Sequence, residues 1–242
     1  MTASTIKIAS RDGGEFDCYL ATPVSADPVP AVVLAVAIHG VDKDIRDLAD
    51  AFASAGFIAA APDLFWRTTP GPLPRSDNRA GERALPRPEK IKTGEADMAD
   101  TLAALGKVKG FNGRAAAMGF CYGGPYAMIG PKRLGYAAGI SCHGSRMMDY
   151  VGEFDGVTAP VCIIWGDQDT QAPADVIAAY RAVAERQKNV EVDIFPGVQH
   201  GYMMRDAGAA FDAKTRDFSF ARTLAILGGL RGGGGEALRK AS

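Results

Sequence analysis

The sequence predicts an α/β fold, in which a mostly parallel central sheet is flanked by helices and preceded by an antiparallel hairpin. One observation behind this fold class is that short, almost wholly apolar runs alternate with longer segments whose apolar residues recur at helical spacing. Such strands are buried on both faces, as in a parallel sheet covered by helices. The other is size, since 242 residues, 47% of them hydrophobic, can bury the core of one large domain. We expect a single domain over residues 1–230 and a Gly-rich, flexible tail over residues 231–242.

Each element is assigned from a local pattern. Apolar-polar alternation around a Gly pair predicts the hairpin, continuous apolar runs predict buried strands, and apolar residues at helical spacing predict helices. Asp44 is a candidate N-cap for the first helix, which Gly56 ends. The expected elements are a hairpin over 5–20, strands over 31–38, 57–61, 115–118, 136–142, 161–165 and 190–195, and helices over 44–55, 95–105, 174–186 and 215–227.

Residues 68–92 do not fit this alternation. The segment contains five prolines and several arginines, and it has little apolar periodicity. It is too long for an ordinary connection, so it is either a lid or binding loop or a mobile surface excursion. We favour the functional loop.

Composition excludes several classes of protein. The net charge of −1 and pI near 6.3 give no electrostatic reason to bind nucleic acid or an anionic membrane. Residues 1–10 lack the pattern of an export signal, and no apolar window reaches the roughly 18 residues of a membrane helix. The four cysteines are widely spaced, without C-x-x-C pairs or metal-ligand spacing, so we expect reduced thiols, no metal and a cytoplasmic location.

The stretch Gly119-Phe120-Cys121-Tyr122-Gly123-Gly124 lies between a predicted strand and a segment of helical composition. The pattern G-x-C-x-G is that of a nucleophile elbow, with cysteine where serine is usual. The start of the helix favours a thiolate there, because its N–H groups and dipole stabilise negative charge. Cys121 is therefore the candidate nucleophile, although a small buried cysteine in a tight turn is the alternative.

Two further groups follow strand ends in the order expected of a nucleophile, acid and histidine triad. Asp169 leaves the strand over 161–165, and His200 follows the strand over 190–195. His200 would act as the base and Asp169 would orient its imidazole. Asp167 competes with Asp169 for this role, and either could instead shape a turn. Attack by Cys121 on an ester would give a thioester acyl-enzyme that water then hydrolyses.

An oxyanion formed in this reaction needs two N–H donors, for which we expect the backbone amides of Tyr122 and Ile38. His39 and His143 also leave strand ends, and they would line the pocket or satisfy local backbone. A metal site built from the three histidines has no ligand spacing to support it. Met147, Met148, Met203 and Met204 could wall an acyl pocket or fill the core, and Trp66 could close over substrate or simply pack.

With these motifs the chain resembles the dienelactone hydrolase family of α/β-hydrolases, whose members include carboxymethylenebutenolidases. The resemblance spans residues 30–227 and includes Ile38-His39-Gly40-Val41, Pro62-Asp63-Leu64, Gly166-Asp167-Gln168-Asp169 and His200-Gly201. It implies a cytoplasmic, cofactor-free hydrolase of lactone or enol-ester bonds that uses Cys121, Asp169 and His200. It also implies a small-molecule substrate and a monomer or weak homodimer, with no nucleic-acid or membrane partner.

The chain departs from that family at two points. The glutamate that activates the cysteine in well-known members is replaced by Ala37, so we expect Cys121 to depend directly on His200, with His39 filling part of the space. Family arginines hold a substrate carboxylate, and here the candidates are Arg79, Arg83 and Arg205, none of which aligns cleanly. Arg83 and Arg205, together with Tyr202, Trp66, His39 and His143, are our candidate pocket residues.

We therefore expect a hydrolase of small carboxylic esters or lactones. One alternative is a promiscuous esterase that acts on activated esters, including phosphotriesters, for which a soft nucleophile is suited. Another is a non-catalytic small-molecule binding protein on the same fold. A thiol redox protein is disfavoured, because no resolving cysteine adjoins Cys121 in the sequence.

Overall fold

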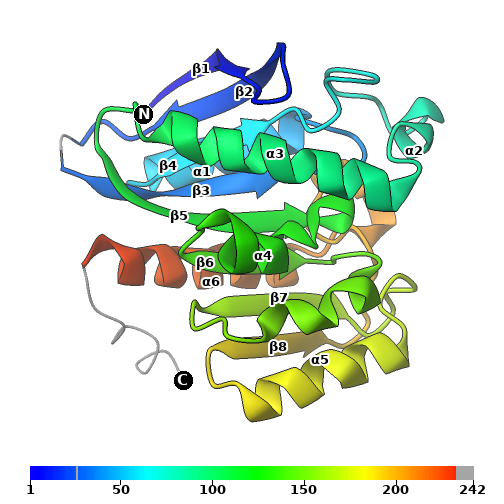
Figure 1. The fold of residues 1–242 in the computed structure, drawn as a ribbon. Helices are drawn as coiled ribbons and strands as arrows, with labels where there is room; N and C mark the ends of the chain where they lie inside the picture. Colours follow the sequence, from blue (N-terminus) through cyan, green and yellow to red (C-terminus); the bar gives the residue numbers. More distant parts are fainter. Residues whose placement is uncertain (26, 233–242) are drawn as a thin grey trace.

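An eight-stranded sheet forms the centre of the molecule, with strand order β1-β2-β4-β3-β5-β6-β7-β8 (Figure 1). The structure is a computed structural model that describes residues 1–25 and 27–232, so all but two residues of the expected tail, 231–242, lie outside the described chain. The strands are β1 Thr2–Ala9, β2 Glu15–Thr22, β3 Val29–Ala35, β4 Ile58–Pro62, β5 Phe111–Phe120, β6 Ala138–Cys142, β7 Val161–Gly166 and β8 Val190–Phe195.

The hairpin and the parallel part of the sheet are both present, as the sequence predicted. β1 pairs antiparallel with β2, and β2 pairs antiparallel with β4, whereas β4, β3, β5, β6, β7 and β8 are joined by parallel pairings. Every residue of β3, β4, β6 and β7 is buried, which explains their almost wholly apolar sequences. The carboxyl ends of the parallel strands therefore share one edge of the sheet.

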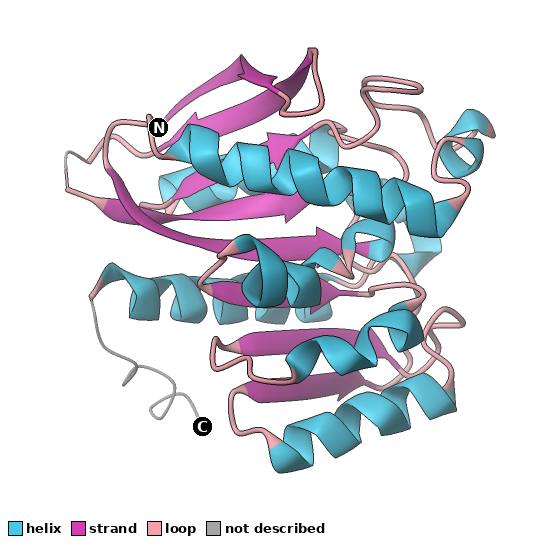
Figure 2. Cartoon of the chain, in the orientation of Figure 1, coloured by secondary structure: helices cyan, strands magenta, loops and turns pink. Residues whose placement is uncertain are grey.

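Helices cover both faces of the sheet, as Figures 1 and 2 show. On one face lie α3, α4 and α5, and on the other lie α1 and α6. Their bounds are α1 Lys43–Ser54, α2 Arg79–Glu82, α3 Arg87–Leu105, α4 Tyr126–Ile129, α5 Ala174–Arg186 and α6 Ala213–Arg231. Short 3-10 turns occupy Cys121–Gly123, Met147–Phe154 and Arg205–Ala210, and a π-helical turn occupies Gly130–Leu134.

Three local predictions are corrected. The N-cap of α1 is Asp42, whose carboxylate accepts from the Ile45 amide at 2.9 Å, while Asp44 lies in the first turn. The segment over 68–92 is not wholly a loop, because α2 lies inside it and α3 begins at Arg87. Proline misled the prediction there, since it is compatible with the first turn of a helix and Pro88 occupies that turn.

The segment after Cys121 is also shorter as an α-helix than its composition indicated. Only Tyr126–Ile129 is regular α-helix, and Pro131 lies in the π-helical turn that follows. Proline has no N–H to donate to the preceding turn, which accounts for the change in winding.

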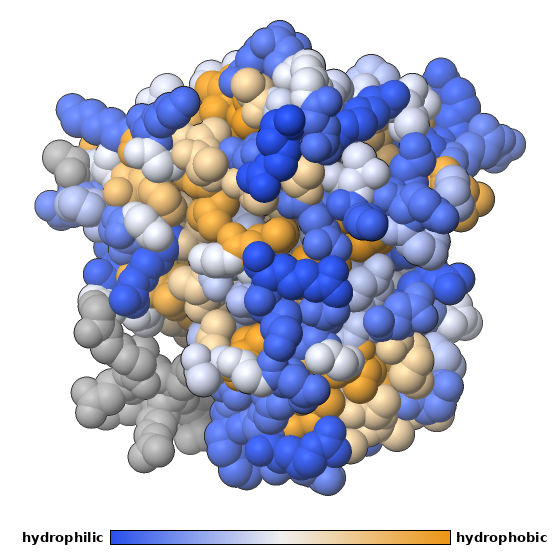
Figure 3. All heavy atoms as spheres, in the orientation of Figure 1, coloured by the Kyte–Doolittle hydropathy of each residue, from blue (hydrophilic) through white to orange (hydrophobic). Residues whose placement is uncertain are grey.

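On the surface of the α3 face, hydrophilic and hydrophobic residues are interspersed, and neither kind covers the whole face (Figure 3). Scattered apolar side chains of this kind are ordinary for a protein surface. Within residues 1–25 and 27–232, we find no helix with the length and hydrophobicity to cross a membrane.

Candidate active site

Cys121 lies at the tip of a sharp turn between β5 and the helical segment. Its φ of +50° is in the left-handed region, which non-glycine residues seldom adopt. The flanking residues must be glycine because other backbone atoms approach them closely. A Cβ at Gly119 would lie 2.0 Å from the Gly123 carbonyl oxygen, and a Cβ at Gly123 would lie 2.1 Å from the Ala35 carbonyl oxygen. The strained turn holds the thiol, which is partly exposed, at the carboxyl edge of the sheet.

Asp169 and His200 are brought together at the same edge. The His200 Nδ1 atom lies 2.9 Å and 3.0 Å from the two carboxylate oxygens of Asp169. Asp169 is only 3% exposed, and its Oδ1 also accepts from the Gln171 amide at 2.8 Å. The alternative acid, Asp167, instead accepts from the Gly197 amide at 2.7 Å and shapes the turn after β8. The geometry thus pairs Asp169, not Asp167, with the imidazole.

Because Nδ1 faces Asp169, the Nε2 atom of His200 is the one left for chemistry. It is buried and has no hydrogen-bond partner within the described chain. Burial on its own lowers the pKa of His200, but the hydrogen bond to Asp169 and the interaction with Cys121 raise it to about 10. Burial alone likewise raises the pKa of Cys121, whereas His200, Ser145 and Arg87 together lower it below the ordinary value. Both shifts favour a thiolate-imidazolium pair.

A small cavity of about 120 Å³ opens beside the thiol. Cys121, His200, His39 and His143 line it, which brings together residues that follow four different strands. The remaining lining residues are Ala37, Ile38, Asp42, Ile45, Arg75, Gly201 and Met204. The mixture of aliphatic walls with a few polar groups is typical of a site for a small organic molecule.

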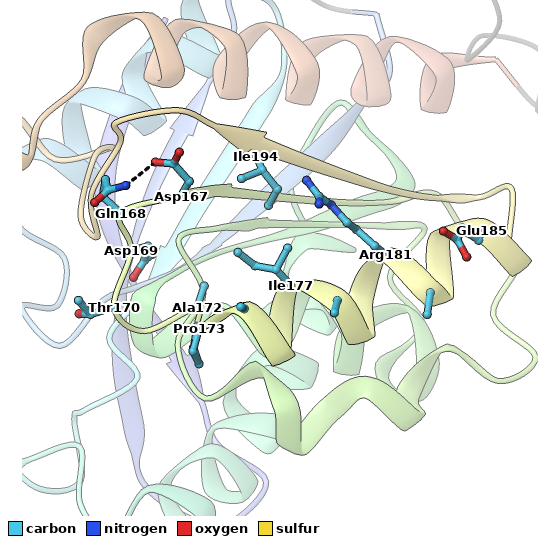
Figure 4. A pocket seen from close by; sticks show the side chains of 13 residues that line it. Asp167, Gln168, Asp169, Thr170, Ala172, Pro173, Ile177, Arg181, Glu185 and Ile194 are labelled. Atoms are coloured by element: carbon cyan, nitrogen blue, oxygen red, sulfur yellow. Dashed lines mark hydrogen bonds between the residues drawn. The ribbon is translucent and has the colours of Figure 1, made fainter.

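A larger hollow, of about 730 Å³, lies between α5 and the ends of β7 and β8 (Figure 4). Ile177 and Ile194 point into it, and Arg181 and Glu185 border it. It does not contain Cys121 or His200. Size therefore does not identify the reactive site in this molecule, and the convergence of chemical groups does.

The two expected oxyanion donors, Ile38 and Tyr122, differ in how they relate to the cavity. Ile38 lines the cavity, and its carbonyl accepts from the Arg83 Nε atom at 2.9 Å. The Tyr122 side chain is buried against Phe65, with ring centroids 4.9 Å apart, so Tyr122 can serve the cavity only through its backbone.

His39 and His143 both line the cavity, as expected of pocket residues. His39 is half-buried, and its Nδ1 lies 3.3 Å from the Leu73 carbonyl oxygen. His143 is 1% exposed, has a φ of +41°, and has no hydrogen-bond partner at either ring nitrogen in the described chain. Its ring meets that of His200 edge-on at 4.9 Å. Burial and the charge of His200 hold the pKa of His143 well below its usual value, so it is neutral.

Four predicted pocket residues do not line this cavity. Trp66 donates from Nε1 to Asp97 at 3.2 Å and stacks on Phe16, so it packs rather than closing over substrate. Tyr202 is fully buried, with its hydroxyl 3.0 Å from Ser219. The place of Trp66 and Tyr202 in the sequence does not show which way their side chains point, so the sequence could not tell that they face away from the cavity.

The other two are arginines. Arg83 is 3% exposed and donates to the carbonyls of Ile38, Thr69 and Gly71, so it fixes loops instead of meeting a ligand. Arg205 is largely exposed and lies 3.8 Å from Asp47. Arg79, the other candidate for a carboxylate, pairs with Asp77. Of the four methionines considered, only Met204 lines the cavity; Met147 and Met203 are buried, and Met148 is exposed.

Sequence reasoning missed Arg75, Asp42, Ser145 and Arg87. Arg75 lies in the segment we expected to be functional, lines the cavity, and donates from Nε to Asp206 at 2.7 Å. Ser145 lies three residues after the end of β6, and this place near a strand end was the signal that could have identified it.

Metal-ligand side chains gather elsewhere. Among the described residues, the single group with three ligand atoms within 4.8 Å of one another is Cys162, Glu191 and Asp193, on β7 and β8. The Arg222 guanidinium already pairs with Glu191 there. The three histidines of the cavity do not form such a group within residues 1–25 and 27–232.

A sequence profile described as the dienelactone hydrolase family matches residues 16–230. The chain belongs to the dienelactone hydrolase family. Carboxymethylenebutenolidase 1 of Cupriavidus pinatubonensis, a relative of this family member, is 29% identical over 235 residues, which cover 96% of this chain and 99% of the relative.

Solved structures show the same fold. A protein of Klebsiella pneumoniae that is assigned as a dienelactone hydrolase superposes with a TM-score of 0.81 at 23% identity, covering 94% of this chain and 98% of the other. A dienelactone hydrolase-like promiscuous phosphotriesterase from metagenomic libraries superposes with a TM-score of 0.77 at 19% identity, covering 95% and 99%. The fold of this dienelactone hydrolase family member is that of the α/β-hydrolases, as the sequence predicted.

Proposed function

We propose that the protein hydrolyses lactones or small carboxylic esters by nucleophilic catalysis at Cys121. Membership of the dienelactone hydrolase family supports a hydrolase of lactone or ester bonds. The observation that carries the mechanism is the convergence of Cys121, His200 and Asp169, with the imidazole hydrogen-bonded to the carboxylate at 2.9 Å beside the cavity that the thiol lines.

The reaction begins from the thiolate of Cys121 and the imidazolium of His200. The thiolate attacks the carbonyl carbon, a C–S bond forms, and the carbonyl π electrons move to the oxygen. The backbone amides of Ile38 and Tyr122 are the proposed donors to this oxyanion. When the intermediate collapses, the ester C–O bond breaks and the departing oxygen takes the proton from His200 Nε2, which leaves a thioester on Cys121.

Deacylation uses the same groups in reverse. Neutral His200 takes a proton from water, and the resulting hydroxide attacks the thioester carbonyl. The C–S bond breaks, the acid is released, and the thiolate-imidazolium pair is restored. Asp169 keeps the imidazole in the orientation that presents Nε2 throughout.

Activation in this proposal runs directly through His200, because Ala37 offers no carboxylate on the wall of the cavity. A His200→Asn variant tests it. We expect its Cys121 to react with iodoacetamide only at higher pH than the wild-type thiol, since the imidazolium that stabilises the thiolate is gone. An alkylation profile that overlays the wild type would refute this route.

Turnover of p-nitrophenyl acetate tests the function itself. We expect activity that iodoacetamide abolishes, that substrate protects, and that Cys121→Ala eliminates. Asp169→Asn should lose most activity, whereas Asp167→Asn, which changes the neighbouring carboxylate, should keep much more. Turnover that persists in Cys121→Ala would remove Cys121 from the nucleophile role.

The same assay separates the rival functions. A panel of lactones, aryl esters with and without a carboxylate, and an activated phosphotriester compares lactonase, esterase and phosphotriesterase activity in one protein. Absence of turnover with every member would favour a non-catalytic binding protein on this fold. We propose a single catalytic domain that acts as a monomer or weak homodimer in the cytoplasm, and light scattering after gel filtration checks the oligomeric state.

A further inference from the structure

Ser145 contacts the nucleophile from the end of β6. It is 2% exposed, its amide donates to the Cys121 carbonyl at 3.0 Å, and its Oγ lies 3.8 Å from Cys121 Sγ. Distance alone does not say which of the two atoms is the donor, because a hydroxyl and a thiol can each donate or accept.

Arg87 favours one direction for that contact. Its Nη2 atom lies 2.9 Å from Ser145 Oγ, 3.1 Å from the Ser145 carbonyl and 3.1 Å from the Tyr122 carbonyl. A guanidinium has only donors, so Ser145 Oγ must accept from Arg87. A thiolate at Cys121 carries no hydrogen and can only accept, so the Ser145 hydroxyl, whose hydrogen the contact with Arg87 does not use, donates to Cys121 Sγ.

Arg87 also lacks an ordinary counterion. No carboxylate of residues 1–25 and 27–232 forms an ion pair with it, and its Nε is buried without a hydrogen-bond partner there. Its guanidinium lies over the Tyr122 ring at 4.9 Å, next to the nucleophile turn. A partly buried cation without a carboxylate is costly, so a thiolate at Cys121 is the anion that offsets it.

We propose that Ser145 and Arg87 are positioning residues for Cys121: Arg87 orients the Ser145 hydroxyl so that it donates to the thiolate, and the guanidinium acts as a second cation for that thiolate beside His200. This inference rests on the proposed role of Cys121 as nucleophile. It explains how a thiolate is stabilised in a member of this family in which Ala37 lines the site.

Other charged or titratable groups line the same cavity as the thiol, and the test must leave these residues unchanged. They are His200 after β8, His143 after β6, His39 and Asp42 after β3, and Arg75 from the segment before α2. Because variants at Ser145 and Arg87 leave all of these in place, a change in thiol ionisation can be assigned to the substituted residue.

The test measures the rate of iodoacetamide alkylation of Cys121 against pH, by mass spectrometry of its peptide. We expect Ser145→Ala and Arg87→Met each to raise the apparent pKa of Cys121 by about 0.5 to 1, so that alkylation at pH values below the wild-type apparent pKa slows by about three- to tenfold. Ser145→Thr, which keeps the hydroxyl, should restore most of the rate. Exposed Ser4→Ala and Arg114→Met are the matched controls and should leave the profile unchanged.

A double variant tests the coupling. If Arg87 acts partly through Ser145, Arg87→Met should have a smaller effect in the Ser145→Ala background than in the wild type. Folded Ser145→Ala and Arg87→Met proteins whose profiles overlay the wild type would overturn the inference. If Arg87→Met does not fold, the alkylation profiles of Arg87→Lys and Ser145→Ala test the inference instead. Lysine keeps the positive charge but cannot contact both carbonyls and the hydroxyl in the same way.

The outcome is separable from that of the proposed function. Alkylation reports the ionisation of the thiol whether or not the protein turns over an ester. Raised pKa values in these variants, combined with turnover that survives Cys121→Ala, would support the inference and reject the nucleophile. Unchanged pKa values, combined with loss of turnover in Cys121→Ala, would reject the inference and support Cys121 as the nucleophile.

Discussion

At the scale of the residue, the chemistry of the site depends on whether His200 is protonated. His200 is held between a buried carboxylate and a thiol, and its raised pKa means that the folded protein binds the proton more tightly than the unfolded chain does. The same proton that stabilises the thiolate thus also links stability to pH. Asp169 is the residue through which that linkage can be altered, because it is the acceptor for Nδ1.

Substituting Asp169 tests the linkage. A group whose folded pKa is raised contributes stability that is fully present below its unfolded pKa, here 6.5, and that is lost as pH rises through about 10. We expect Asp169→Asn to lose more unfolding free energy, relative to wild type, near pH 6.5 than near pH 10, as measured by urea denaturation. Its kcat/KM should fall by about 10³- to 10⁴-fold.

Asp167→Asn is the control for this pH series. Its carboxylate bonds to a backbone amide and not to an imidazole, so its effect on stability should stay flat over the same range. A constant stability difference between Asp169→Asn and wild type from pH 6.5 to 10 would contradict the linkage.

Chain order was enough to predict which residues meet, but not which way neighbouring side chains point. Cys121, Asp169 and His200 each follow a strand whose carboxyl end reaches one sheet edge, so their proximity follows from topology. Tyr202 lies next to Gly201 of the site in sequence but turns into the core, and Trp66 packs on Phe16 away from the cavity. Arg87 and Ser145 could not be paired from sequence, because their contact depends on where α3 begins.

At the scale of the element, the turn after β5 is fixed by backbone contacts that have no room to adjust. A Cβ at Gly123 would meet the Ala35 carbonyl oxygen at 2.1 Å and its carbon at 2.5 Å. Because both colliding atoms belong to the backbone of a buried strand, relief would require β3 and the turn to separate.

We therefore expect Gly123→Ala to lower the free energy of unfolding by more than about 3 kcal/mol and to lose activity. Gly152→Ala is the matched control, since nothing lies within 4 Å of its added Cβ and its change should be within about 0.5 kcal/mol. Urea denaturation followed by circular dichroism measures both. A Gly123→Ala protein of wild-type stability would show that the turn is less constrained than these distances require.

The segment before α3 is held to the site by Arg83. Its bonds to Ile38, Thr69 and Gly71 are 2.7 to 2.9 Å long, and they join the proposed oxyanion loop to the start of that segment. We expect Arg83→Met to increase proteolytic cleavage within residues 68–86 and to lower kcat more than it changes KM. Arg114→Met, at an exposed position, is the comparison. Unchanged cleavage in Arg83→Met would rule out this anchoring role.

Element prediction succeeded where periodicity was strong and failed where proline was involved. The buried strands were recognisable because nearly every residue in them is apolar, and the hairpin because its turn carries two glycines. Pro86 and Pro88 indicated a loop, yet they precede and open α3. Whether proline breaks a helix or begins one depends on its position within the first turn, which sequence alone does not reveal there.

At the scale of the whole molecule, one thiol differs from the others. Cys18, Cys142 and Cys162 are buried in the sheet, and burial raises the pKa of Cys18 and of Cys142 to about 12. Cys121 is partly exposed and its pKa is lowered. The sequence predicted that these three thiols are buried, from their place in apolar or alternating runs, and the structure confirms their burial.

Titration with a disulfide reagent such as DTNB checks the contrast. We expect one thiol to react rapidly in the native protein and four in denaturant, because reactivity requires both exposure and the thiolate form. Cys121→Ala should remove the fast phase and leave three thiols in denaturant. A second fast thiol in the native protein would show that one of the strand cysteines is accessible.

The parallel order of the strands has a consequence for how the protein is made. Cys121 emerges during synthesis before Asp169 and His200, and their side chains meet only after β7 and β8 have joined the sheet. A nascent chain that stops before residue 200 therefore carries an ordinary, weakly reactive sulfur. Activation of the thiol by the His200 imidazole is therefore expected only after the last part of the polypeptide has left the ribosome and docked.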